Sequence, residues 1–193
     1  MRKSPTETRT AIRRATLRAC CRRGYRSTTL QEIAHQVGLT RGAVLHHFNS
    51  KADLLAAVVE PYHRHLDAML DAAVLGDPPT AAEREQLLRD LAAVVLDHRP
   101  IVELLAHDLA AQETVGLAPN SGERTRRLTG LLAGSCATQT EQVRAAAALG
   151  AILHPVASAW LNLDGPEARA TLIDAGLAAI NVDMISTAPK GGN

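Results

Sequence analysis

The chain of 193 residues is 46% hydrophobic but only 2% aromatic, which allows a sizeable core of Ala, Leu and Val and indicates an all-α fold. Its three cysteines do not form a disulfide framework and its charged N-terminus is no signal peptide, so we expect a cytoplasmic protein. The net charge of +1 is divided unevenly, with +9 on residues 1–51 and −8 on residues 52–193.

The charge division predicts two domains with different partners, 1–51 and 52–193. Residues 1–51 hold 11 Lys and Arg against 2 Asp and Glu, whereas residues 52–193 hold 10 against 18. A basic segment next to an acidic one attracts a polyanion, and nucleic acid is the commonest such partner.

The first three predicted helices lie within the basic part. Residues 6–23 place apolar side chains on one face at helical spacing, and Gly24 follows as a stop. Thr29 and Glu32 have the spacing of a capping box, which predicts a second helix from residue 29 to Gly38. Thr40 is a good N-cap for a short third helix over residues 41–48.

Two short capped helices joined by the turn Gly38-Leu39-Thr40 form a helix-turn-helix pattern. In such a motif the second of the two helices enters the major groove of DNA, which is about 12 Å wide. The pattern together with the local charge predicts a DNA-binding head.

Residues 12–59 resemble the DNA-binding head of the TetR family of bacterial one-component regulators. The matching residues include Gly24-Tyr25, Thr28-Thr29-Leu30, Ile33-Ala34, Val37-Gly38-Leu39-Thr40-Arg41-Gly42, His47-Phe48, Ser50-Lys51 and Leu54-Leu55. Two positions depart from the family: Leu45 stands where a tyrosine usually touches phosphate, and Cys20 stands where a phenylalanine is common.

We expect the third helix to make the base contacts. Arg41 lies early in it and can donate two hydrogen bonds to guanine, while Gly42 and Ala43 allow close approach and Ala43 can meet a thymine methyl. Adjacent histidines point about 100° apart on a helix and chelate poorly, so His46 and His47 are interpreted as DNA contacts. The alternative for His47 is a half-buried structural histidine. The remaining expected contacts, to the DNA backbone, are Thr28, Thr29, Thr40 and Lys51.

Beyond Ser50 the pattern predicts a long helix followed by helices over 80–97, 100–112, 122–135, 138–163 and 166–184, about nine in all and no strand. Residues 145–161 are apolar almost all round, and a helix of that kind needs cover on both sides. We therefore expect a homodimer through 138–163 and 166–184, as in the family, rather than a membrane span.

The resemblance also implies a pocket for a small-molecule effector in the C-terminal domain. Asp108 and Gln112 fall within an apolar arc, where a ligand, a buried partner or water would satisfy them, and the nearby His98 and Arg99 could supply that partner. The full set of expected lining residues is Tyr62, His98, Arg99, Leu105, Asp108, Gln112, His154 and Trp160. With so few aromatics, a small apolar or amphipathic effector fits better than a cation held in an aromatic cage.

The sequence thus predicts a ligand-responsive repressor that binds a palindromic operator as a homodimer and is released by an inducer. No catalytic motif, cofactor site or metal site is expected. Two alternatives remain open at this point: a thiol- or metal-responsive regulator, through Cys20 and Cys21 or through His63 and His65, and a small helical enzyme.

Overall fold

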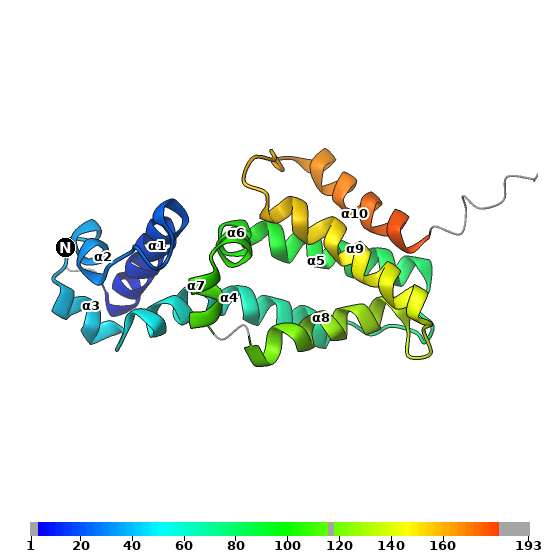
Figure 1. Cartoon of the computed structure of the whole chain (residues 1–193), viewed down its shortest axis with the longest axis horizontal. Helices are drawn as coiled ribbons and strands as arrows, with labels where there is room; N and C mark the ends of the chain where they lie inside the picture. The colour runs from blue at the N-terminus through cyan, green and yellow to red at the C-terminus, as the bar shows by residue number, and fades with distance from the viewer. Residues whose placement is uncertain (1–3, 116–117, 182–193) are drawn as a thin grey trace, which may run out of the picture. The chain divides into compact units, whose positions relative to one another are not determined.

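A computed structural model describes residues 4–115 and 118–181, and within them it contains ten α-helices and no strand (Figure 1). The all-α prediction is confirmed. The helices are α1 Pro5–Arg23, α2 Leu30–Gln36, α3 Arg41–His47, α4 Lys51–Ala72, α5 Ala81–Asp97, α6 Arg99–His107, α7 Leu109–Thr114, α8 Ala118–Ala133, α9 Gln139–Ala157 and α10 Pro166–Ile180.

Four helices begin at a complete capping box. Ser4 with Glu7 opens α1, Thr29 with Glu32 opens α2, Thr80 with Glu83 opens α5 and Thr138 with Glu141 opens α9. In each, the hydroxyl accepts from the third helical amide and the glutamate accepts from the cap amide, so two otherwise unpaired N–H groups are bonded.

The chain forms two compact units. The first comprises the described parts of Met1–Ala68 and Asp97–Glu123, and the second comprises those of Met69–Leu96 and Arg124–Asn193. The predicted boundary at residue 51 therefore falls inside the first unit, which also holds α6 and α7. The division at residue 51 between a DNA-binding part and a ligand-binding part stays a prediction.

Two of the apolar clusters in the first unit involve buried residues of α1. One joins α1, α2, α3 and the start of α4 through Ile12, Ala15, Ile33, Ala34, Val44, Phe48 and Leu54. The other joins α1 and α4 to α6 and α7 through Cys20, Tyr25, Leu55, Leu104 and Ala111. Helices α1, α2 and α3 are referred to below as the head, and the second cluster fixes α6 and α7 against it.

In the second unit, α9 and α10 pack side by side along their length (Figure 1). Gly176 permits the close contact. A Cβ at this position would lie 3.1 Å from Leu88 Cδ1 and 3.5 Å from the carbonyl oxygen of Ala148. Leu88 and Ile152 are fully buried, so the core of this unit lies between α5, α9 and α10.

The helix predicted over 100–112 is in fact two helices, α6 and α7. Asp108 takes an extended conformation (φ −112°, ψ 94°) and its Oδ1 accepts from the amide of Ala111 at 2.9 Å. Asp108 therefore ends one helix and caps the next, which an amphipathic pattern running through the break does not reveal.

Other helix bounds also differ from the prediction. The helix predicted over 138–163 ends at Ala157. Ser158 is extended there, and its amide donates to the carbonyl of Pro155 rather than to that of His154, as a continuing α-helix would require. The helix predicted over 122–135 is α8, which begins at Ala118 and ends at Ala133. The end predicted near residue 184 lies outside the described residues. Across residues 4–115 and 118–181, no helix has the length and apolar character needed to cross a lipid bilayer.

Candidate nucleic-acid interface

Helix α3 presents one face to solvent and buries the other. Val44 is fully buried and Phe48 is 4% exposed, whereas Arg41, Gly42 and His46 are exposed. The Thr40 hydroxyl accepts from the amide of Ala43 at 3.1 Å and so begins the helix at the predicted residue. The outward face carries the predicted base contacts and no acidic residue.

The turn between α2 and α3 has the geometry of the predicted motif. Gly38 adopts φ +70°, a left-handed conformation that favours glycine. The amide of Leu39 returns to the carbonyl of Ala34 at 2.9 Å, and Ala34 itself is fully buried. A larger side chain than alanine would separate the two helices at this point.

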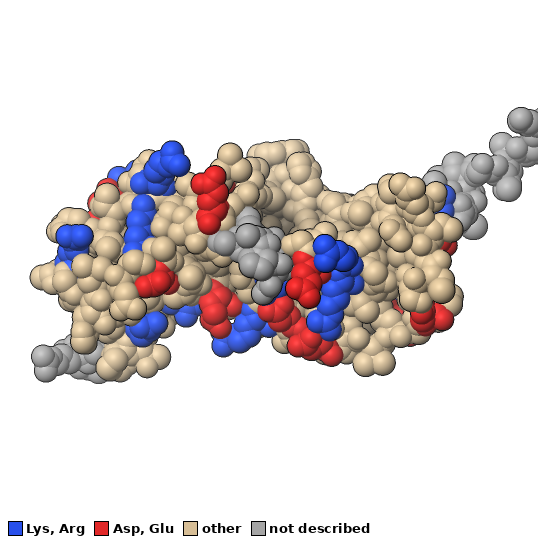
Figure 2. Space-filling view, turned by 60° about the horizontal axis from the view of Figure 1, so that its bottom comes forward, with Lys and Arg blue, Asp and Glu red and all other residues tan. Residues whose placement is uncertain are grey.

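Both acidic residues of the basic segment are used to cap helices. Glu7 accepts from the amide of Ser4 at 2.7 Å, and Glu32 accepts from that of Thr29 at 3.1 Å. The amide of Thr29, and then Arg23 at 2.6 Å, lower the pKa of Glu32. Figure 2 shows basic side chains spread over the N-terminal helices, with fewer acidic side chains among them.

Lys51, a predicted phosphate contact, is held in place at the start of α4. Its Nζ lies 4.1 Å from the centroid of the Tyr25 ring and donates to the carbonyl of Arg26 at 3.3 Å. The cation–π contact orients a long side chain that would otherwise be mobile. The sequence reasoning did not assign Tyr25 this part, because the two residues are 26 positions apart.

Arg9 is a second residue that the sequence reasoning missed. Its Nη1 donates to the carbonyl oxygen of His47 at 2.5 Å, and its guanidinium lies 4.3 Å from the Phe48 ring centroid. The last turn of α3 is therefore held by a side chain from α1. His47 is half-buried and His46 is exposed.

Thr28 is corrected by the structure, because its side chain is 1% exposed. Its hydroxyl donates to the carbonyl of Gly24 at 2.9 Å, so it closes the turn after α1 and is left out of the interface proposed below. Thr29 and Thr40 are exposed and cap α2 and α3. The place of Thr28 in the family signature predicts a DNA contact, but the sequence does not reveal that its side chain is buried.

The predicted ligand-lining residues divide into three groups. Tyr62, His98 and Leu105 lie together in the first unit, where Tyr62 packs on the Val59–Ile101–Leu105 cluster and its ring centroid lies 5.8 Å from that of His98. His98 Nε2 is 2.8 Å from His65 Nδ1. Burial, and then the proximity of His65, lower the pKa of His98.

Asp108, Gln112 and Arg99 form the second group, and each has a partner within the chain. Asp108 Oδ2 accepts from the amide of Tyr25 at 2.5 Å. Gln112 Nε2 donates to the carbonyl of Leu105 at 2.5 Å, and Arg99 Nε pairs with Glu103 at 2.7 Å. The expectation that His98 and Arg99 satisfy Asp108 is therefore wrong, because the break at Asp108 turns its carboxylate toward the head.

His154 and Trp160 form the third group, and both are exposed on the single chain, Trp160 by 83%. His154 lies on α9, whereas Trp160 lies beyond its end at Ala157 and so outside the helix predicted for it. A role for either in ligand binding stays a prediction.

Among the residues that the structure describes, no group of three or more His, Cys, Asp or Glu side chains could hold a metal ion. The rings of His46 and His47 are 5.7 Å apart and inclined at 64°, in agreement with the divergence expected of neighbours on a helix.

Comparison with known proteins gives the same reading of the head. Residues 12–58 match the family model "Bacterial regulatory proteins, tetR family". The chain is 40% identical over 105 residues to the HTH-type transcriptional regulator TtgR of Pseudomonas putida, covering 52% of this chain and 50% of TtgR. It is 35% identical over 106 residues to the regulator AcrR of Shigella flexneri, covering 52% and 49%. Each match spans about half the length of these curated relatives.

Solved structures share the fold over nearly the whole chain. A TetR-like transcriptional regulator from a Rhodococcus species superposes with a TM-score of 0.68 at 22% identity, covering 93% of this chain and 98% of that one. The TetR family regulator PfmR from Thermus thermophilus gives 0.65 at 19% identity, covering 88% and 96%. At these identities the likeness concerns the fold alone.

Proposed function

This chain belongs to the TetR family of bacterial transcriptional regulators, and on that premise we propose that it is a repressor that binds operator DNA as a homodimer and is released by a small-molecule effector. The observation that supports DNA binding most directly is the outward face of α3. Arg41, Gly42 and His46 are exposed there, above a helix fixed by Val44 and Phe48. Ala43, His47, Thr29, Thr40 and Lys51 complete the proposed interface, and the cytoplasm is the proposed compartment.

The proposed homodimer is supported by the exposed surface of α9. Along this helix an apolar stripe of Val143, Ala146, Ala147 and Gly150 is exposed at helical spacing, with Val143 63% exposed. Small residues permit close helix packing, and an unpaired apolar stripe is stabilised by a copy of itself. In a two-fold dimer the two α3 helices would read half-sites about 34–36 Å apart, or a multiple of that distance.

The response to an effector is proposed to pass through α6 and α7. These helices share an apolar cluster with α1 and α4, and Asp108 bonds to the turn after α1. An effector that shifts α6 would therefore move the head. Release by about a hundredfold requires the effector to prefer the non-binding state by about 2.7 kcal/mol.

The proposal is tested by selecting duplexes from a random pool with the full chain and then measuring affinity by fluorescence anisotropy. We expect an inverted repeat, and an affinity that falls steeply with salt, with a slope of about −0.9 in log K per phosphate contact. A His46→Ala and Arg41→Ala double variant with an unchanged circular dichroism spectrum is the control and should lose the selected preference. Failure to enrich any sequence, or binding that is insensitive to salt, would overturn the proposal.

The thiol-responsive alternative is less well supported. Burial raises the pKa of Cys20, and burial together with Cys20 and Glu103 raises the pKa of Cys21 to about 11. Thiols with raised pKa values form little thiolate at neutral pH and react slowly with oxidants. The absence of a three-ligand group among the described residues gives the metal alternative no site there.

A further inference from the structure

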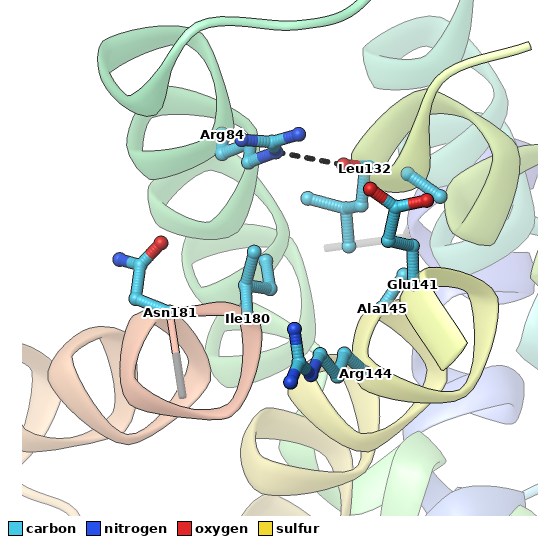
Figure 3. Close-up of a pocket in the computed structure, with 8 residues that line it drawn as sticks. Arg84, Leu132, Glu141, Arg144, Ala145, Ile180 and Asn181 are labelled. Carbon is cyan, nitrogen blue, oxygen red and sulfur yellow. Dashed lines mark hydrogen bonds between the residues drawn. The ribbon is translucent and has the colours of Figure 1, made fainter. Parts of the chain in front are cut away.

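The second unit contains a hollow of about 450 Å³ that none of the predicted ligand-lining residues borders. Four helices contribute to its wall, and Figure 3 shows the residues that line it. They are Arg84 from α5, Leu132 from α8, Glu141 and Arg144 from α9, and Ile180 from the end of α10 with Asn181 beside it. A volume of this size accommodates a small organic molecule.

Arg84 is positioned to receive an anion. Its Nε donates to the carbonyl of Leu132 at 2.9 Å, which fixes the plane of the guanidinium and leaves both terminal nitrogens for another partner (Figure 3). No carboxylate in the described part of the chain lies within ion-pair distance of it. A guanidinium fixed in this way pairs well with the two oxygens of a carboxylate.

The one acid in the wall does not neutralise this site. Oε2 of Glu141 accepts from both the amide and the hydroxyl of Thr138, each at 2.7 Å, as part of the capping box of α9. Those bonds, and then Arg144 and Arg84, lower the pKa of Glu141, so it stays ionised. The carboxylate of Glu141 thus makes its hydrogen bonds within the capping box and not with Arg84.

Apart from Asn181, the rest of the wall is apolar. Leu132 and Ala145 are buried and Ile180 is half-buried, so apolar side chains from three helices line the hollow. A ligand with a charged end and an apolar body would satisfy both parts of the wall.

We propose that this hollow binds an organic monocarboxylate, with its carboxylate on Arg84 and Arg144 and its apolar body against Leu132 and Ile180. The proposal goes beyond the proposed repressor function, because it requires neither DNA nor a second copy of the chain.

The test is isothermal titration of the full chain with octanoate, octan-1-ol, octylamine and acetate. We expect octanoate to bind and the other three to bind at least about tenfold more weakly, since each lacks either the charge or the apolar body. Arg84→Gln and Arg144→Gln should each weaken octanoate binding by about tenfold to a hundredfold. Arg89→Gln, on the same helix but outside the hollow, is the matched control and should leave the affinity unchanged.

Equal affinities for octanoate and octan-1-ol would show that the hollow does not recognise the carboxylate. Equal affinities for octanoate and acetate would show that it does not recognise the apolar chain. If Arg84→Gln fails to fold because the bond to Leu132 is lost, Arg84→Lys retains the charge without the paired donors and should still bind more weakly. An Arg144→Gln protein that is folded and binds octanoate as tightly as the parent would also overturn the proposal. Operator affinity, measured separately, distinguishes this failure from a failure of the repressor function.

Discussion

The carboxylate of Asp108 accepts a hydrogen bond from the backbone nitrogen of Tyr25, 83 residues earlier in the chain. The same carboxylate caps α7 through Ala111, and a Cβ added at Gly24 would lie 3.3 Å from its Oδ2. One side chain therefore ends α6, begins α7 and holds the turn that leads from α1 into the helix-turn-helix. The contact lies where a signal from the C-terminal helices would reach the head.

Replacement of Asp108 by alanine should lower the free energy of unfolding by about 2–3 kcal/mol, because a helix cap and a charge-assisted bond to Tyr25 are lost together. Urea titration followed by circular dichroism measures the change. The matched control is Thr138→Ala, which removes a cap without a long-range bond and should cost about 1 kcal/mol. Equal losses in the two variants would show that the Tyr25 bond contributes nothing.

Arg41→Ala should weaken operator binding by about 1–3 kcal/mol, and the loss should be confined to one base position in each half-site. The physical reason is that a paired guanidinium donor recognises guanine and no other base. Anisotropy against a set of single-base operator variants measures it. Arg14→Ala, which removes an exposed charge from α1, serves as the control. A loss of the same size on every operator variant would contradict base recognition by Arg41.

Lys51→Met should weaken binding to all sequences alike and reduce the slope of log K against log salt by about 1, because one phosphate contact is lost. Methionine keeps the apolar stem that packs over Tyr25. The same anisotropy assay at several salt concentrations provides the slope. An unchanged slope would mean that Lys51 serves only the contact with Tyr25 and the carbonyl of Arg26.

The His65–His98 pair should make stability depend on pH. Burial, and then the neighbouring His65, disfavour the charged form of His98 in the folded state, so its pKa lies below the ordinary 6.5. Between the folded and unfolded pKa values the unfolded chain binds more protons, so stability is full above about 6.5 and falls as the pH is lowered. Asp97 opposes the shift and limits its size.

Urea midpoints measured from pH 8 to pH 5 test this expectation. His98→Gln should flatten the profile over that range, whereas His35→Gln, an exposed histidine on α2, should leave it unchanged. A parent profile with the same slope as that of His98→Gln would contradict the assignment.

The head could be predicted in detail because its signals are local. Thr29, Glu32 and Thr40 are caps that sequence spacing identifies, and each begins a helix at the predicted place. Gly38 marks the turn in the same way. Helix starts of this kind depend on residues within one turn of each other, so they are visible in the sequence alone.

The parts that were missed depend on contacts between distant segments. Nothing near Asp108 in the sequence indicates that Tyr25 is its partner, and nothing near Lys51 indicates an aromatic ring below it. Thr28 matches a family contact position, yet its burial arises from packing around Gly24 and Cys20. Arg84 and Arg144 likewise line one hollow only because α5, α8, α9 and α10 pack around it.

The bond from Arg9 to the last carbonyl of α3 has a consequence for how repression could be lifted. Because Arg9 of α1 holds the C-terminal end of α3, unwinding of α3 would break both its bond to the His47 carbonyl and its contact with the Phe48 ring. Backbone amides of Val44 and Phe48 should therefore stay protected from hydrogen exchange whether or not DNA is bound. Release from DNA would then change the position of the head and leave the packing inside it unchanged.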